Sequence, residues 1–304
     1  MNGNFRSGFV TLVGRPNAGK STLLNAFLGE KLAIVTPKPQ TTRDRILGVA
    51  SVDDGQIIFL DTPGVHKGRK ALNKHLSEVA LSTIGDVDVV LFVIDAGDAA
   101  RKGLKHDDER IIEAIQAAGC TSIALLNKVD TVAKERLLPL IAHLSEREVF
   151  STIIPVSATK DDGLSIALTE TLALLPEGPP LYPEDELTDK PMRFLVGELL
   201  REQIFLSMKQ EVPYSVAVEI IRFKEREDGK LVEIDATIHV ERTSQKGIIL
   251  GKGGQNIKEV STIAREEIEK LVGKKVFLRT HVRVEPNWTK NERSMRKLGY
   301  SKSK

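Results

Sequence analysis

Short apolar runs alternate with longer stretches of helical spacing along the first 175 residues. The runs are rich in β-branched residues and have the length of strands, which favours a mostly parallel sheet with helices on both faces. Residues 46–61 differ, because two runs flank an Asp-Asp-Gly turn that is typical of a hairpin. We therefore predict an α/β domain with one antiparallel edge strand. Its six strands are predicted at 9–14, in the two halves of 46–61, and at 87–95, 121–127 and 152–157.

The pattern changes after residue 191. A helical stretch, two alternating runs around an Asp-Gly turn, a second helical stretch and a final apolar run predict an α+β domain of order α-β-β-α-β. The segment PEGPPLYPEDELTDKP carries five prolines, which disfavour both helix and central strand. We expect it to connect two domains, and we place them at residues 1–178 and 192–304, with a linker at 179–191.

Composition and charge limit the kinds of binding site and partner that we expect for this chain. Its 304 residues are 41% hydrophobic, enough for two modest cores, and no apolar run approaches the length of a membrane span. The single cysteine and the six histidines show no metal-ligand spacing, which makes a zinc site improbable. The net charge is only +2, but residues 241–304 hold 16 basic and 7 acidic side chains. This excess favours a polyanion, either nucleic acid or anionic lipid.

The strongest motif is GRPNAGKS at 14–21, which matches the phosphate-loop pattern and falls between a predicted strand and a predicted helix. Its glycines allow the backbone N–H groups to wrap a β-phosphate, and the helix adds its positive N-terminus. Lys20 is expected to bridge the β- and γ-phosphates, Ser21 to ligate Mg²⁺ and Thr22 to contact the α-phosphate. The sequence therefore predicts a nucleoside triphosphate site.

Two shorter motifs follow predicted strands. DTPG at 61–64 puts Asp61 where it can hold Mg²⁺ through water and Gly64 where its N–H can sense a γ-phosphate. NKVD at 127–130 offers Asp130 to N1 and N2 of guanine, and adenine cannot satisfy that carboxylate. Asn127 would tie the base to the phosphate loop, Lys128 would lie along the ring, and the Ala158 N–H of VSA could reach guanine O6. These motifs favour GTP over ATP.

A polar, proline-flanked segment at 37–45 has the character of a mobile switch. A threonine hydroxyl there would complete Mg²⁺ coordination only while the γ-phosphate is present, and we favour Thr42 over Thr41. The predicted catalytic residues are Lys20, Thr42 and Gly64, and the predicted Mg²⁺ ligands are Ser21, Thr42 and Asp61. The predicted nucleotide-binding residues are Gly14, Arg15, Pro16, Asn17, Ala18, Gly19, Lys20, Ser21, Thr22, Asp61, Thr62, Pro63, Gly64, Val65, Asn127, Lys128, Val129, Asp130, Ser157 and Ala158.

Together GRPNAGKS, QTTRDR, DTPG, NKVD and VSA resemble the bacterial Era family of translation-factor-related GTPases. The resemblance spans the chain and implies a phosphate-loop GTPase domain followed by a KH domain. In Ras-like enzymes a glutamine after DxxG orients the attacking water, whereas Val65 stands here. We therefore expect slow, Mg²⁺-dependent hydrolysis of GTP to GDP and phosphate. Asn17 resembles the asparagine with which related GTPases hold K⁺, so we also expect K⁺ stimulation.

A second glycine loop lies in GIILGKGGQNIKEV at 247–260. It is one residue short for a phosphate loop and lacks the Ser or Thr that would ligate Mg²⁺. GKGG instead fits the GXXG loop that joins two helices in KH domains and clamps about four nucleotides. A hairpin before these helices and a strand after them is the type II arrangement. The predicted RNA-binding residues are Lys246, Ile249, Gly251, Lys252, Gly253, Gly254, Ile257 and Lys258; Ile248 could pack beside them.

The Era resemblance implies a function and a location. It implies binding to 16S rRNA near its 3′ end, assistance in assembly of the small (30S) ribosomal subunit, and some peripheral association with the inner face of the cell membrane. The lack of a long apolar run predicts a cytoplasmic protein, and we expect a monomer. The basic tail at 290–304 could reach RNA or be a solvated end. The alternative is a GTP-regulated membrane-associated or protein-binding module whose C-terminal domain does not bind RNA. NKVD disfavours a third candidate, a phosphate-loop metabolic kinase.

Overall fold

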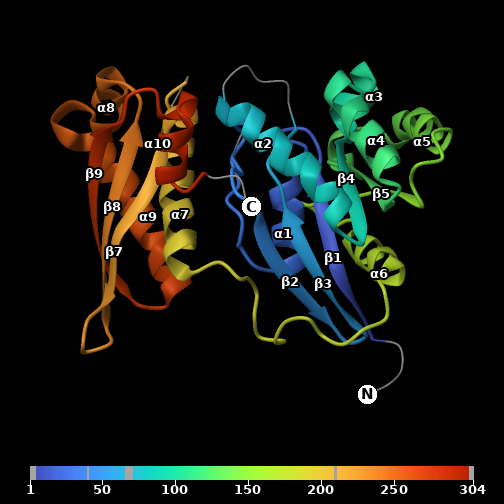
Figure 1. Ribbon diagram of the computed structural model, residues 1–304, viewed down its shortest axis with the longest axis horizontal. Coiled ribbons are helices and arrows are strands. Elements are labelled where there is room, and N and C mark those ends of the chain that lie inside the picture. The colour runs from blue at the N-terminus through green and yellow to red at the C-terminus, as the bar shows by residue number, and fades with distance from the viewer. Residues whose placement is uncertain (1–4, 40, 66–70, 209–210, 301–304) are drawn as a thin grey trace. The chain divides into compact units, whose positions relative to one another are not determined.

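The computed structural model describes residues 5–39, 41–65, 71–208 and 211–300 of the chain. It divides into two compact units (Figure 1). The first comprises most of the chain up to Asp189, and the second begins at Lys190 and also includes Ile34–Thr41. That short segment joins the second unit because it pairs with a helix there; for example, the Val35 N–H donates to Glu202 Oε1 at 2.9 Å. The predicted switch at 37–45 is therefore divided, and its Gln40 lies outside the described residues.

The first unit is built on a six-stranded sheet of order β2-β3-β1-β4-β5-β6. Strand β2 pairs antiparallel with β3, and the other neighbouring strands are parallel, which confirms the predicted sheet and its antiparallel edge. Most strand residues are buried, because helices cover both faces of the sheet. The strands are β1 (Arg6–Val13), β2 (Ile46–Val52), β3 (Gly55–Asp61), β4 (Val89–Asp95), β5 (Thr121–Asn127) and β6 (Thr152–Pro155).

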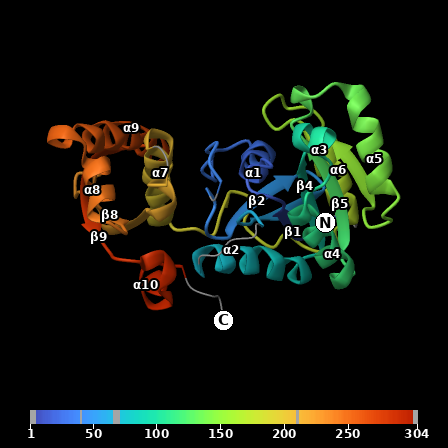
Figure 2. The same ribbon diagram turned by 90° about the horizontal axis from the view of Figure 1, so that it is seen from above.

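Helices α1 and α6 lie on one face of this sheet, and α2 and α4 lie on the other (Figure 2). The aromatic rings of Phe27 in α1 and Phe59 in β3 stack at 5.2 Å, while Ile111 and Ile115 of α4 join the core of the opposite face. Two layers of helices thus enclose one parallel sheet. The helices are α1 (Lys20–Leu28), α2 (Ala71–Ser82), α3 (Ala96–Lys102), α4 (His106–Ala118), α5 (Leu137–Ser145) and α6 (Leu164–Leu174).

The proline-rich segment after α6 contains no helix or strand element within the described residues 175–191, as its composition indicated. It does not hang free, however. The Leu187 carbonyl accepts the Val49 N–H at 2.9 Å, and Gln56 Oε1 accepts the N–H groups of Leu181 and Tyr182 at 2.8 and 2.9 Å. The segment therefore lies along the β2 side of the first unit and satisfies polar groups there.

The second unit is a three-stranded sheet, of order β7-β8-β9, packed against helices. Strands β7 and β8 form the predicted antiparallel hairpin, and β9 pairs parallel with β8. Two helices, α8 and α9, stand between β8 and β9, so the order is α-β-β-α-α-β when the short α8 is counted. The elements are α7 (Met192–Ser207), β7 (Ala217–Glu225), β8 (Leu231–Val240), α8 (Thr243–Leu250), α9 (Gln255–Val272) and β9 (Lys275–Val284). No helix among the described residues is long and apolar enough to cross a membrane.

The basic tail is largely folded rather than a solvated end. It contains α10 (Glu292–Lys297), and the side chains of Trp288, Met295 and Tyr300 are buried. The rings of Trp288 and Tyr300 stack at 5.5 Å, and the Trp288 indole N–H donates to the Ser215 carbonyl at 2.9 Å. This segment is therefore part of the second unit up to residue 300, and residues 301–304 lie outside the described residues.

Candidate functional sites

The phosphate loop connects β1 to α1 at the carboxyl edge of the first sheet, where ligands bind in open α/β folds. Its two glycines are required by geometry. A Cβ on Gly14 would collide with the Val93 carbonyl of β4, and a Cβ on Gly19 would collide with the Asn127 side chain. Gly19 also has a φ of 99°, which L-residues rarely adopt. The loop can therefore approach both β4 and β5 closely.

Lys20 is the buried cation of this loop, with 6% of its surface exposed. Its Nζ donates to the carbonyl oxygens of Gly14 and Arg15, each at 3.1 Å. Loss of hydration lowers the pKa of Lys20 to about 8, although the Asp61 carboxylate opposes that shift. The ammonium thus lies inside the loop, where a phosphate would stabilise its charge.

Three side-chain oxygens meet beside Lys20, and we call Ser21, Thr42 and Asp61 the magnesium cluster. Ser21 Oγ lies 2.7 Å from both Asp61 Oδ2 and Thr42 Oγ1, and Thr42 Oγ1 donates to Asp61 Oδ2 at 3.2 Å. Asp61 is fully buried, its Oδ1 has no hydrogen-bond partner, and burial raises the pKa of its carboxyl group. A cluster of hard oxygens with an unsatisfied carboxylate fits Mg²⁺. The hydroxyl of Thr41 points elsewhere and donates to the Lys38 carbonyl.

The DTPG motif packs directly on the phosphate loop. The Val65 N–H donates to the Gly14 carbonyl at 3.1 Å, and Thr62 Oγ1 donates to the Leu12 carbonyl at 2.7 Å. A Cβ on Gly64 would lie 2.6 Å from the Pro16 nitrogen, so only glycine permits this approach. Val65 is fully buried and apolar, which leaves it unable to orient a water.

The NKVD and VSA motifs come together at the end of β5. Asn127 Nδ2 donates to the Ala18 carbonyl at 2.9 Å, and Asn127 Oδ1 accepts the Ala158 N–H at 3.2 Å. Ser157 Oγ donates to Asp130 Oδ1 at 2.6 Å, and Asp130 is otherwise exposed. The loop that would bind a base is thus tied to the loop that would bind phosphate, as the sequence predicted.

Three acidic residues near this site were not identified from the sequence. Asp95 and Asp98 lie at the end of β4 and the start of α3, and Asp108 lies in α4. Asp95 Oδ2 pairs with Lys128 at 2.8 Å, and Arg15 pairs with Asp98 at 2.7 Å and with Asp108 at 2.8 Å. The signal that could have found Asp95 is its place at the end of a buried strand, on the edge that carries the motifs.

In the second unit the glycine loop joins α8 to α9. Gly251, Gly253 and Gly254 all have positive φ, of 71°, 61° and 78°, so the loop needs glycine for its conformation. Asn256 Nδ2 donates to the Ile248 carbonyl at 2.9 Å, and a Cβ on Gly251 would collide with the Asn256 side chain. Asn256 therefore fixes the loop against the end of α8, a role that no sequence motif signalled.

The predicted RNA-binding residues fall into two groups. Lys252 and Lys258 are exposed, Lys246 and Ile257 are half-buried, and the loop glycines are accessible. Ile249 is different and corrects our prediction: it is fully buried in the core of the second unit and cannot touch a ligand. Its neighbour Ile248 is 46% exposed, because consecutive residues of α8 face opposite sides.

A groove runs between α9 and β9 beside the glycine loop. Its hollow has a volume of ≈ 260 Å³ and combines apolar walls with hydroxyl and basic groups. Ser261 Oγ and Thr280 Oγ1 lie 3.0 Å apart and join the two walls. Sequence reasoning identified only the α9 residues nearest the glycines, because the pairing of α9 with β9 is set by the fold. The lining residues are Ile257, Lys258, Ser261, Thr262, Arg265, Leu278 and Thr280.

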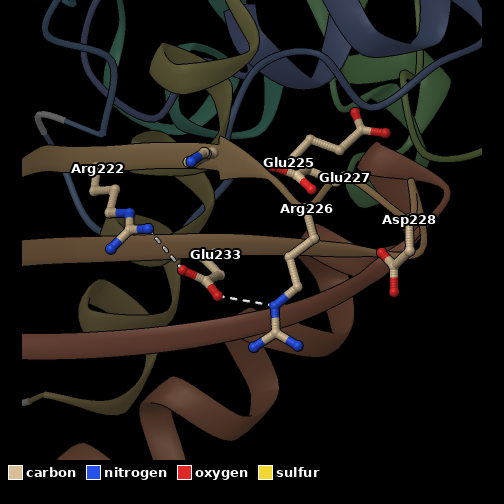
Figure 3. A pocket seen from close by; sticks show the side chains of 7 residues that line it. Arg222, Glu225, Arg226, Glu227, Asp228 and Glu233 are labelled. Atoms are coloured by element: carbon tan, nitrogen blue, oxygen red, sulfur yellow. Dashed lines mark hydrogen bonds and ion pairs between the residues drawn. The ribbon is translucent and has the colours of Figure 1, made fainter.

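Another hollow, of ≈ 380 Å³, lies at the β7–β8 hairpin (Figure 3). Two of its arginines share one carboxylate: Glu233 pairs with Arg222 and Arg226, each at 2.9 Å. The Arg226 hydrogen bond is the largest cause of the lowered pKa of the Glu233 carboxyl group. The hairpin therefore carries a surface ion-pair network, and the groove remains the better candidate for a ligand.

Two protein-family models match the chain. Residues 9–128 match the model described as 50S ribosome-binding GTPase, and residues 211–289 match the KH domain model. A protein named GTPase Era from Geobacter metallireducens is 48% identical over 297 residues, which cover 98% of each chain. The chain belongs to the Era family of GTPases. It is therefore an enzyme that hydrolyses GTP and that carries a C-terminal KH domain.

Solved structures of Era proteins share the fold over the full chain. A crystal structure of a single-residue variant of Aquifex aeolicus Era, bound to GDP and aluminium fluoride, superimposes with a TM-score of 0.92 at 39% identity and covers 97% of this chain and 99% of its own. An Era complex with MgGDPNP and nucleotides 1506–1542 of 16S ribosomal RNA superimposes with a TM-score of 0.93 at 38% identity, covering 98% and 99%. The predicted fold class, a phosphate-loop GTPase domain followed by a type II KH domain, is confirmed.

Proposed function

We propose that this protein is a GTP-controlled switch that binds 16S rRNA near its 3′ end through its KH domain and assists assembly of the 30S subunit. The observation that carries the proposal is the glycine loop Gly251–Gly254, which leads into a helix whose groove is lined by Lys258 and apolar side chains. The Era protein solved with a fragment of that RNA is similar over nearly the whole chain. The excess of basic residues in 241–304 supplies the charge.

The second unit has the features of a single-strand clamp. A Cβ added at Gly253 would meet no other atom within 4 Å, so this side of the loop is open and an RNA backbone can approach it closely. Lys252 lies within the glycine loop and Lys258 lies in α9; both are exposed and can contact phosphates. Bases would then lie along the groove, against Ile257 and Leu278, with Ser261, Thr262 and Thr280 offering hydroxyls to base edges.

In the first unit we propose that GTP is held and cleaved by positioned charges rather than by a side-chain base. Lys20 would bridge the β- and γ-phosphates, and the Gly64 N–H would contact the γ-phosphate from the opposite side. Ser21 and Thr42 would ligate Mg²⁺, with Asp61 holding a metal-bound water. When bound, Mg²⁺ would neutralise charge on the phosphate oxygens. Asp130 would select guanine, held in place by Ser157.

Because Val65 is buried and apolar, hydrolysis needs an additional positive group. We propose that K⁺ fills this role at Asn17, whose backbone φ of 64° turns the phosphate loop at that position. Single-turnover hydrolysis should be faster in K⁺ than in Na⁺ buffer, and equal rates would contradict the proposal. Asn17→Gly is the matched control, because glycine keeps the positive φ but removes the side-chain oxygen. It should abolish the difference between the two ions.

RNA binding is tested with a short single-stranded oligonucleotide of the 16S 3′ end in the presence of GTP. The paired variant Lys252→Asp and Gly253→Asp should abolish a salt-dependent mobility shift, because two carboxylates would face the RNA backbone. Lys230→Asp is the control: it repeats the Lys-to-Asp change, −2 of the −3 charge change of the paired variant, at the exposed hairpin turn, which lies at the opposite end of the second unit from α8 (Figure 1). It should bind like the unmodified protein.

Failure of the intact protein to bind would favour the alternative, a protein-binding or membrane-associated module. An equal loss of RNA binding in Lys230→Asp would show that the loss comes from the change in net charge and not from the glycine loop. We further propose a cytoplasmic monomer and, on the basis of the family resemblance, its peripheral association with the inner membrane. Recovery only in the soluble fraction at low salt would contradict the membrane part of this proposal.

A further inference from the structure

Two carboxylates outside the nucleotide-binding motifs lie between the two halves of the predicted GTP site. Asp95 ends β4 and Asp98 stands in the first turn of α3. Strand β4 lies between β1 and β5, the strands that lead into the phosphate loop and into NKVD. The start of α3 is therefore adjacent to both loops, and one basic side chain from each loop pairs with a carboxylate there.

Asp95 holds the lysine of NKVD. Its Oδ2 lies 2.8 Å from Lys128 Nζ, which also donates to the Asn17 carbonyl of the phosphate loop at 2.5 Å. Lys128 has a positive φ of 66°, and its Cε passes 3.8 Å from the position a Cβ of Gly19 would occupy. The long side chain is thus stretched across the loop and fixed at its charged end.

Asp98 holds the arginine of the phosphate loop. Arg15 Nη2 lies 2.7 Å from Asp98 Oδ2, and Arg15 Nε lies 2.8 Å from Asp108 Oδ2. Lys105 also pairs with Asp98, and Lys105 and Arg15 together hold the pKa of this carboxyl group well below its usual range. The side chains of Arg15 and Asp98 are only 15% and 18% exposed, so water screens this pair less than a surface pair.

The two carboxylates are linked to each other. Asp95 Oδ1 accepts the backbone N–H of Asp98 at 2.9 Å and so caps α3. We propose that Asp95 and Asp98 are positioning residues for GTP binding, which fix the base-binding loop through Lys128 and the phosphate loop through Arg15. This inference rests on the proposed assignment of those loops to the nucleotide. Each carboxylate pairs with a basic side chain of one loop, so both act by holding the loops in order before the nucleotide binds.

A preordered site loses less conformational entropy on binding, and the loss of order shows mainly in the rate of release. Asp95→Asn separates positioning from helix capping, because asparagine still accepts the cap hydrogen bond but no longer pairs with Lys128. We expect this variant to release both fluorescent GDP and fluorescent GTP about tenfold faster than the unmodified protein. Single-turnover hydrolysis at saturating GTP should stay within about twofold, and the melting temperature without nucleotide should not change.

The decisive experiment is a double-mutant cycle of Asp95→Asn and Lys128→Met, read by nucleotide release. If Asp95 acts through Lys128, the double variant releases GDP no faster than Lys128→Met alone. Fully additive effects of the two substitutions would overturn the positioning role of Asp95. Normal release from Asp95→Asn together with fast release from Lys128→Met would do the same, and both outcomes would leave the assignment of Lys128 to the nucleotide intact. Normal release from Lys128→Met would instead overturn the assignment of Lys128 to the nucleotide, and the inference with it.

Asp98 is tested in the same assay. Asp98→Asn should also accelerate release of GDP and GTP by about tenfold, because it frees one end of Arg15. Glu113→Gln is the matched control, since it removes a carboxylate from an exposed position of the neighbouring α4. Equal effects of the two variants, or a loss of hydrolysis at saturating GTP without faster release, would contradict the role of Asp98.

Discussion

At the residue scale, the nucleotide site depends on charges that are buried before any ligand arrives. Lys20 is 6% exposed and Asp61 fully buried, and burial lowers the pKa of the first and raises that of the second. The sequence indicated both residues, since each motif fixes a residue type at a fixed spacing. No motif contains Asp95 or Asp98, and the only sequence signal was the place of Asp95 at the end of a predicted strand; their pairing with Lys128 and Arg15 follows from the order of β1, β4 and β5.

The lowered pKa of Lys20 predicts proton uptake on nucleotide binding. At pH 8 about half of the free protein should carry a neutral Lys20, and phosphate favours the charged form. Binding of MgGDP should therefore be accompanied by proton uptake at Lys20, and this uptake should be larger at pH 8 than at pH 7. Titration calorimetry in buffers of different ionisation enthalpy measures this directly. Zero uptake at pH 8, or larger uptake at pH 7, would contradict the burial of a titrating Lys20.

The threonine pair at 41 and 42 offers a matched test of the magnesium cluster. Thr42 lies 2.7 Å from Ser21 Oγ, whereas the Thr41 hydroxyl bonds to the Lys38 carbonyl. Thr42→Ala should slow single-turnover hydrolysis about 100-fold, since it removes a group that acts while the γ-phosphate is present. Thr41→Ala should change the rate by less than about threefold. Equal hydrolysis rates in the two variants would contradict the assignment of Thr42, rather than Thr41, as the Mg²⁺ ligand.

At the scale of elements, the helices and strands followed the sequence closely where residue periodicity was strong. Helix α9 occupies Gln255–Val272 between Gly254 and Gly273, both with positive φ, and glycines at helix ends are a readable signal. The short α8 was harder, because in a run of three apolar residues the sequence alone does not determine which side chain enters the core. The fold of 288–300 was missed for a related reason: its few apolar residues are widely spaced in a basic segment.

Because Ile249 of α8 is buried and its neighbour Ile248 is exposed, substituting each should lower the free energy of unfolding by a different amount. Ile249→Ala should destabilise the second unit by about 3 kcal/mol, because it leaves a cavity in the core. Ile248→Ala should cost less than about 0.5 kcal/mol, because this side chain is 46% exposed. Urea unfolding followed by tryptophan fluorescence reports the second unit alone, since the chain has one tryptophan, Trp288. Equal shifts of the two unfolding midpoints would contradict the orientation of α8.

At the scale of the whole molecule, the nucleotide-binding part and the proposed RNA-binding part of the chain have net charges of opposite sign. The GTPase part, residues 1–190, has a net charge of −5, whereas residues 241–304 have +9. A polyanion should therefore be drawn to the second unit and repelled by the first, apart from the nucleotide site itself. The division into two units agrees with the two matching family models, and the segment predicted as a linker packs along the first unit up to Asp189.

The central claim is that GTP controls how the KH domain holds RNA from the 3′ end of 16S rRNA. It is tested most directly by crosslinking the protein to cellular RNA in GTP and in GDP and sequencing the bound fragments, beside the variant Lys252→Asp and Gly253→Asp. The account predicts fragments concentrated at the 3′ end of 16S rRNA, different yields with the two nucleotides, and loss of the fragments in the variant. Fragments spread evenly over cellular RNA, or an unchanged profile in the variant, would contradict it.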